Sequence, residues 1–130
     1  MPLVFEDEEA GEMERLLLQA SQGAVRLLVP PLFWYEVGNV LRQAAVRKRL
    51  SDDEAETALY RVTELPINTD NDLSPAITLR IGRFAARYNL TMYDAAYFEL
   101  ADRHNASLFT RDKALLGISH ECPWIRSVVE

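Results

Sequence analysis

The sequence has few of the residues that form small metal, thiol and phosphate sites. It contains one cysteine, Cys122, so the chain cannot form an internal disulfide. Its two histidines, His104 and His120, are not spaced as a pair of zinc ligands. Its five glycines are scattered, which excludes a glycine-rich phosphate-binding loop. These shortages argue against disulfide scaffolding, thiol chemistry and a zinc site.

Long hydrophobic runs and excess positive charge are missing as well. No apolar stretch approaches the roughly 20 residues that cross a bilayer, and the first residues lack the order of a signal peptide. We therefore expect a cytoplasmic protein with no membrane association. The net charge of −6 disfavours a purely electrostatic nucleic-acid binder. Since 12 of the 14 basic residues are arginine, which suits phosphate and carboxylate, RNA and acidic proteins remain compatible partners.

Helical and strand patterns alternate along the 130 residues, which predicts a single α/β domain over 1–130 with a mostly parallel sheet. Ser51 and Glu54 fit a capping box, and the pair Ser74 and Pro75 favours a helix start. Residues 1–5 are a weak strand candidate because of Pro2 and the acidic run that follows. The remaining expected elements are helices at 6–21, 32–49, 51–64 and 75–88, a helical turn at 113–116, and strands at 26–29, 66–69 and 124–129.

The stretch from Thr91 to Asp112 organises the rest of the chain. It reads as a helix that starts at Thr91 and ends near His104, then a short apolar strand, then Asp112. In an α/β layer the strand runs back beside the helix, so its carboxyl end returns to the amino end of the helix. Asp94 and Asp112 are therefore expected at one edge of the sheet, where clustered acids suggest a divalent cation.

Glu36 is a third candidate acid, and it lies among apolar and aromatic neighbours on the helix at 32–49. A carboxylate held there must find partners or become neutral. Asn39, one turn further on, is suited to orient it in the way that residues behind a metal ligand do. The structural alternative is an exposed helix acid, or one paired with Arg42 or Arg47.

Asp94 and Asp112 have structural alternatives too. Thr91 and Asp94 fit a capping box, although an acid in a first helical turn also points out of the helix start, where a cation or substrate would lie. Asp112 fits an N-cap for the turn that begins at Lys113. Each acid by itself is weak evidence for a site, and the three must be judged together.

The three acids lie in the segments YEVGNVL at 35–41, TMYDAAY at 91–97 and LFTRD at 108–112. This set resembles the downstream motifs of the PIN-domain family, especially the VapC-type toxins of prokaryotic toxin–antitoxin pairs. The order, spacing and chain length also match, and the resemblance covers essentially the whole chain. The set is fairly specific, whereas none of its members is specific singly.

The resemblance implies a PIN-like three-layer sandwich, in which a central, mostly parallel sheet is flanked by helices. It implies a Mg²⁺- or Mn²⁺-dependent endoribonuclease whose acids gather at one end of the sheet. Glu36, Asp94 and Asp112 match three of the catalytic, metal-binding positions, and Thr110 matches the small polar residue near the last. It further implies an RNA substrate, a homodimer and a cognate VapB-like antitoxin whose tail enters the acidic groove.

The chain departs from the family pattern at its start. Family members usually begin with a strand that ends in Asp-Ala/Ser-Ser and supplies a first catalytic aspartate. Residues 3–9 instead resemble the helix after that strand, so we expect the strand and its aspartate to be absent, and we assign that role to neither Glu6 nor Asp7. Two hypotheses follow: a metal-dependent endoribonuclease toxin, and a catalytically impaired module that keeps dimer and antitoxin binding.

Overall fold

The computed structural model describes residues 3–5 and 13–127. The elements expected between residues 26 and 116 are confirmed to within a few residues, and the helix expected at 6–21 is described only over its second half. The helices are α1 (Met13–Ser21), α2 (Leu32–Val46), α3 (Asp52–Thr63), α4 (Pro75–Tyr88), α5 (Met92–His104) and α6 (Lys113–Leu116). The strands are β1 (Leu3–Phe5), β2 (Leu27–Val29), β3 (Ile67–Thr69), β4 (Ser107–Thr110) and β5 (Ile125–Ser127).

The five strands form one sheet in the order β3-β2-β1-β4-β5. Strands β2 and β3 are parallel, as are β4 and β5, whereas the central strand β1 runs antiparallel to β2 and to β4. Four strands therefore point in one direction, which confirms the mostly parallel α/β sheet. The carboxyl ends of β2 and β4, after which Glu36 and Asp112 follow in the chain, lie at the same edge.

Strand β1 corrects the expectation for the start of the chain. Leu3–Phe5 were assigned by resemblance to a helix and judged weak as a strand, yet they form the middle of the sheet. Val4 lies opposite both Leu28 of β2 and Leu108 of β4. The physical reason is that Leu-Val-Phe is a β-prone run that can bond to a strand on either side. Residues 6–9, the rest of the segment expected to be helical, lie outside the described part.

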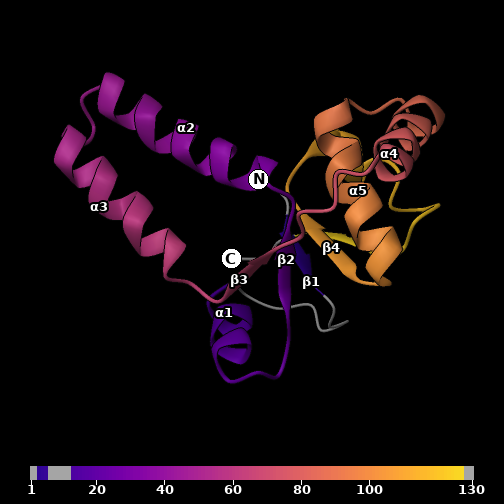
Figure 1. Ribbon diagram of the computed structural model, residues 1–130, viewed down its shortest axis with the longest axis horizontal. Helices are drawn as coiled ribbons and strands as arrows, with labels where there is room; N and C mark the ends of the chain where they lie inside the picture. Colours follow the sequence, from indigo (N-terminus) through magenta and orange to yellow (C-terminus); the bar gives the residue numbers. More distant parts are fainter. Residues whose placement is uncertain (1–2, 6–12, 128–130) are drawn as a thin grey trace.

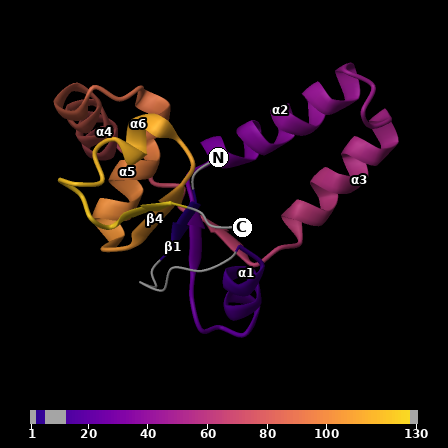
Figure 2. The same ribbon diagram turned by 180° about the vertical axis from the view of Figure 1, so that it is seen from behind.

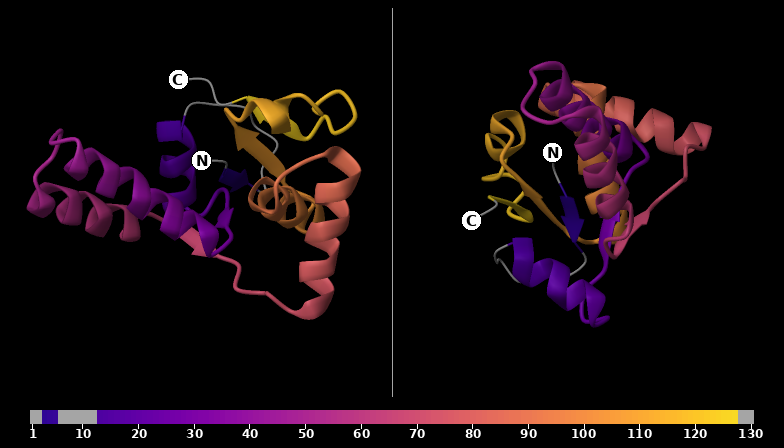
Figure 3. Two further views of the ribbon diagram at one scale, coloured as in Figure 1. Left: turned by 90° about the horizontal axis from the view of Figure 1, so that it is seen from above. Right: turned by 90° about the vertical axis from the view of Figure 1, so that its left-hand side faces the viewer.

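Helix α5 is the central helix of the molecule. It contacts β1, β2 and β4 on one side and α4 on the other, and α1 lies across the sheet from it (Figure 3). Thr91 caps its first turn, and Asn105 ends it in the left-handed conformation with φ of 54°. Because α5 is covered on nearly all sides, its residues from Ala95 to Ala101 are buried, apart from the half-buried Ala96. A helix held in this way fixes the side chains along it.

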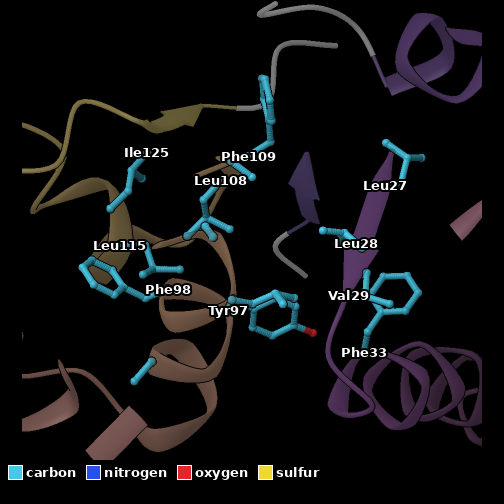
Figure 4. Packing of buried hydrophobic residues seen from close by; sticks show 14 of the residues in the cluster. Leu27, Leu28, Val29, Phe33, Tyr97, Phe98, Leu108, Phe109, Leu115 and Ile125 are labelled. Atoms are coloured by element: carbon cyan, nitrogen blue, oxygen red, sulfur yellow. The ribbon is translucent and has the colours of Figure 1, made fainter. Parts of the chain in front are cut away.

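The core joins the sheet to α5. Figure 4 shows the Tyr97 ring of α5 reaching toward Val29 of β2 and Phe33 of α2, while Phe98 lies on the opposite side, near Leu115 of α6. The described residues of β2 and all of β4 are buried, as expected for strands covered on both faces. Removing this apolar surface from water supplies most of the stabilisation of the fold.

Helices α2 and α3 form an arm that extends away from the sheet (Figures 1 and 2). They pack against each other, and the capping box of Ser51 and Glu54 predicted for α3 is confirmed. No residue of α3, all of which the structure describes, is buried. The start of α2 is anchored differently, since Phe33 is buried and the Trp34 indole donates to Thr69 Oγ1 of β3 at 2.7 Å. Within the described ranges, no helix has the length and apolar character to span a bilayer.

Candidate active site

Glu36 projects from the second turn of α2, just after the anchored start of that helix. The Tyr97 hydroxyl of α5 donates to Glu36 Oε1 at 2.5 Å, a short bond of the kind formed when the acceptor is charged. The carboxylate is half-buried, so it is not the freely exposed helix acid of the structural alternative. Arg42, one of the partners considered for it, meets Asp52 instead at 3.5 Å. The structure thus directs Glu36 toward α5.

Tyr97 is a site residue that the sequence reasoning missed. Its side chain is 1% exposed, and Figure 4 shows its hydroxyl on the side of β2 and α2. Burial, the hydrogen bond to Glu36 and the charges of Glu36 and Asp94 all raise the pKa of Tyr97, so its hydroxyl stays protonated and donates. The available signal was a tyrosine three residues after Asp94 in an otherwise apolar run, because a buried tyrosine hydroxyl needs a partner.

Asp94 lies in the first turn of α5. The Thr91 side chain accepts a hydrogen bond from the Asp94 backbone N–H at 3.1 Å, so the cap expected at Thr91 is confirmed. The pKa of the Asp94 carboxyl is raised by partial burial and by the negative charge of Asp112, and a hydrogen bond from Thr91 opposes the rise. The charge of Glu36 raises it further. Asp94 therefore experiences both other candidate acids at once.

Asp112 follows β4 directly and caps α6. Its Oδ1 accepts from the backbone N–H groups of Ala114 at 2.9 Å and Leu115 at 3.1 Å, which confirms the capping alternative. Its own N–H donates to Oγ1 of the fully buried Thr110 at 2.9 Å. Both cap bonds fall on Oδ1, so capping and ligand binding through the second oxygen are compatible. The turn and the cap together hold this carboxylate at the sheet edge.

The donor set suits a hard divalent cation. Carboxylate oxygens are the ligands that Mg²⁺ and Mn²⁺ prefer, and the raised pKa of Asp94 reflects like charges that a cation would relieve. No three acidic, histidine or cysteine side chains within residues 3–5 and 13–127 are grouped closely enough to enclose an ion. This arrangement still fits Mg²⁺, which usually binds one or two carboxylates, several waters and a substrate phosphate.

The other polar candidates have different surroundings. Asn39 is exposed on α2, and the hydrogen bond to Glu36 comes from Tyr97. His104 is partly buried, and its Nε2 lies 2.7 Å from Asp70 Oδ2. His120 is exposed beside Glu121.

A second group of charges lies further along α5, and sequence reasoning missed it. Glu99 is 1% exposed and accepts from Arg103 Nε at 2.9 Å and from Arg80 Nε at 3.3 Å. Arg103 also donates to Asp70 at 2.9 Å, and Arg80 donates to Asp102 at 3.0 Å. Hydrogen bonds from neighbouring groups outweigh the effect of burial and lower the pKa of Asp70 to about 2. In this group each of the acids Asp70, Glu99 and Asp102 has a basic partner.

Comparison with known proteins gives the same family as the three sequence motifs. Residues 2–120 match the family model of the PIN domain. The chain is 34% identical over 108 residues to VapC ribonuclease Mb0985 of Mycobacterium bovis, a match that covers 81% of this chain and 82% of that protein. It is 32% identical over 118 residues to Ribonuclease VapC3 of Pyrobaculum aerophilum, covering 87% and 83%.

A further relative is matched over less of its length. Ribonuclease VapC1 of Mycobacterium tuberculosis is 35% identical over 86 residues, which are 66% of this chain and 62% of that protein. The chain therefore spans less than two thirds of this relative. The matches to Mb0985 and VapC3 extend further and include most of both chains.

Proposed function

The chain belongs to the PIN domain family, and from this we propose that it is a metal-dependent endoribonuclease of the VapC type. The observation that carries the proposal is the proximity of the three acids, because Tyr97, one turn after Asp94 on α5, bonds to Glu36, and the charges of Asp112 and Glu36 both raise the pKa of Asp94. These acids come from α5, the end of β4 and α2, which are far apart in the sequence. The family match over residues 2–120 supports treating residues 1–130 as one PIN-like domain.

Asp94, Asp112 and Glu36 are proposed to bind the cation in their ionised forms, one or two of them directly and the remainder through its bound waters. Tyr97 keeps the Glu36 carboxylate in one orientation, while Thr110 and the α6 cap fix Asp112. Asn39 is proposed to support Glu36 from the next turn of α2. A bound Mg²⁺ or Mn²⁺ would activate a water and offset negative charge on the scissile phosphodiester. The role of the protein is thus to present oxygens that are already oriented when RNA arrives.

The proposed partners follow from the relatives, whose names describe them as ribonucleases. We propose RNA as the substrate, a cognate VapB-like antitoxin as the inhibitor, a homodimer as the working assembly and the cytoplasm as the location. The arm of α2 and α3 is a suitable contact surface, because Val40, Val46 and Tyr60 expose more than half of their surface there. Light scattering of the purified chain, alone and with its antitoxin, tests the assembly.

Replacement of Asp112 by asparagine tests the catalytic proposal. Asparagine caps helices about as well as aspartate, so Asp112→Asn removes the charge and leaves the cap. With structured RNA and Mg²⁺ or Mn²⁺, we expect cleavage by the natural chain, none with EDTA, and a loss of more than about 100-fold in the variant. Asp102→Asn is the matched control, since Asp102 is an α5 acid that pairs with Arg80.

The proposal is contradicted if the natural chain does not cleave RNA, if EDTA has no effect, or if Asp112→Asn and Asp102→Asn cleave equally. An inactive chain that still binds its antitoxin would support the alternative of an impaired module. Isothermal titration of Mn²⁺ provides a second measurement that does not depend on turnover. We expect Asp112→Asn to weaken that binding and Asp102→Asn to leave it unchanged.

A further inference from the structure

Two strongly exposed tyrosines directly precede site acids in the sequence. Tyr35 is 78% exposed and comes before Glu36 on α2, and Tyr93 is 66% exposed and comes before Asp94 on α5. An exposed aromatic side chain is not unusual by itself, and Tyr60 in the arm is 63% exposed. The position of each ring relative to the acids decides what it can contact.

Tyr93 lies on the side of α5 that faces the acids. It is four residues before Tyr97, so the two rings share one face of the helix, one turn apart. Tyr97 donates from that face to Glu36 of α2. Tyr93 therefore lies one turn closer to the open amino end of α5, above the Tyr97–Glu36 bond and next to Asp94.

Tyr35 lies on a different side of its helix. Phe33 and Val37 form the buried face of α2, and Tyr35 is two residues from each. At about 100° per residue, it points about 160° away from both, so it lies opposite the core. It is also about 100° around the helix from Glu36, which bonds toward α5. Of these two tyrosines, Tyr93 is the one that combines high exposure with a place on the face that carries the acids.

The charge of the protein indicates what an aromatic ring can contribute there. A net charge of −6 limits the affinity for RNA that phosphate contacts can provide. Stacking of a base on an aromatic ring does not depend on net charge, and it tolerates any base. A base can use this surface only when it is unpaired and partly unstacked, as in single strands and loops.

We propose that Tyr93 is a base-stacking residue at the mouth of the acid site and that it selects RNA with an unpaired nucleotide at the point of binding. Because Tyr93 and Asp94 are consecutive, a base on the ring brings its phosphodiester beside the carboxylates. The inference assigns the residue that recognises the base at this site, and it rests on the proposed function. The exposed ring recognises the base, and the acids bind the backbone through their cation.

RNA binding by matched variants tests this inference. Every protein carries Asp112→Asn so that RNA remains intact in Mg²⁺, and fluorescence anisotropy reports the dissociation constant for a labelled 12-nucleotide single strand. We expect Tyr93→Ala to weaken binding about 5- to 150-fold, the range for loss of one stacked base. Tyr93→Phe keeps the ring and should bind as its parent does. Tyr35→Ala removes an even more exposed ring on the other side of α2, and this variant should also bind unchanged.

The same strand annealed to its complement provides the second arm, since paired bases are not free to stack on Tyr93. We expect weaker binding of the duplex and no effect of Tyr93→Ala on it. Equal losses for Tyr93→Ala and Tyr35→Ala, a loss in Tyr93→Phe, or no loss at all would overturn the inference. The last result would point to a protein partner for this ring.

The test separates the inference from the proposed function. Selective loss of single-strand binding in Tyr93→Ala would support the inference even if the natural chain cleaved no RNA. Cleavage by the natural chain with RNA binding that is indifferent to Tyr93 would support the proposed function and overturn the inference. Thermal unfolding of each variant confirms that an exposed substitution has left the fold intact.

Discussion

The acids at the two ends of α5 have opposite electrostatic surroundings. At the amino end, Asp94 lies near two other carboxylates, and its pKa is raised by burial and by their charge. Toward the carboxyl end, Glu99 is almost fully buried but is bonded by Arg80 and Arg103. Asp70, bonded by Arg103 and His104, has a pKa lowered to about 2. A group of like charges thus lies at one end of this helix, and a group of neutralised charges lies toward the other.

The difference between the two groups distinguishes a candidate active site from a structural one. Acids with basic partners contribute to the stability of the fold, because removing either partner leaves an uncompensated charge. Acids that repel each other cost stability and are relieved when a cation or proton binds. We therefore expect substitutions at the amino end to change activity and substitutions at the carboxyl end to change stability.

The largest expected effect is that of Asp94→Asn on activity. The variant removes the carboxylate that is coupled to both other acids, and we expect RNA cleavage to fall by more than about 100-fold. Its free energy of unfolding should stay the same or rise, because a repelled charge has been removed. Cleavage rates and urea unfolding of one preparation measure both. A variant that loses stability as well as activity would contradict the separation of the two ends.

Glu99→Gln is expected to give the reverse pattern. Glutamine cannot compensate the two guanidinium groups that meet Glu99, and Arg103 is only 24% exposed. We expect the free energy of unfolding to fall by about 2–4 kcal/mol, with cleavage per folded molecule near the natural value. Urea unfolding measures the loss. Asp102→Asn is the control, because Asp102 is 43% exposed and its pair with Arg80 should contribute little.

The pH dependence of stability should differ between Asp70 and Asp94. The pKa of Asp70 falls from 3.8 to about 2 on folding, so its contribution is complete above pH 3.8 and is lost as the pH falls toward 2. The contribution is about 2 kcal/mol. The pKa of Asp94 is raised instead, so its ionisation should cost stability as the pH rises through the raised value.

Unfolding of the natural chain and of Asp70→Asn and Asp94→Asn between pH 2 and pH 6 measures these contributions. The difference in the free energy of unfolding between the natural chain and Asp70→Asn should grow in favour of the natural chain as the pH rises. The corresponding difference for Asp94→Asn should change in the opposite direction. Parallel curves for both variants would mean that the two acids have similar surroundings.

Most of the fold could be predicted from the sequence because its signals are local. Ser51 with Glu54, Ser74 with Pro75, and Asn89 each mark a helix end through bonds within a few residues, and the structure confirms all three. β1 could not be predicted in this way. Its three residues form a β-prone run that is too short to decide the element, and their pairing is decided by β2 and β4, which lie far away in the chain.

In the candidate site too, local contacts were predictable and contacts between distant parts of the chain were not. The caps at Thr91 and Asp112 were predictable from spacing, and both form. The order of helix and strand predicted that Asp94 and Asp112 share one sheet edge, and the charge of Asp112 raises the pKa of Asp94. The bond between Tyr97 and Glu36 spans 61 residues, and the pairing of Arg103 with Asp70 spans 33. These contacts depend on how α5 lies against α2 and the loop after β3. No spacing within one element could predict them.

Tyr97→Phe gives the smallest expected effect and examines one contact at the amino end of α5. The substitution removes the hydroxyl that donates to Glu36 and keeps the buried ring, so the core should stay packed. We expect activity to fall about 10-fold, as when a group that orients a metal ligand is lost, and the free energy of unfolding to change by about 1 kcal/mol or less.

If Tyr97 acts by orienting Glu36, raising the Mn²⁺ concentration should restore part of the activity. In a Glu36→Gln background, Tyr97→Phe should have almost no further effect, whereas additive losses would show that the hydroxyl acts on something other than Glu36.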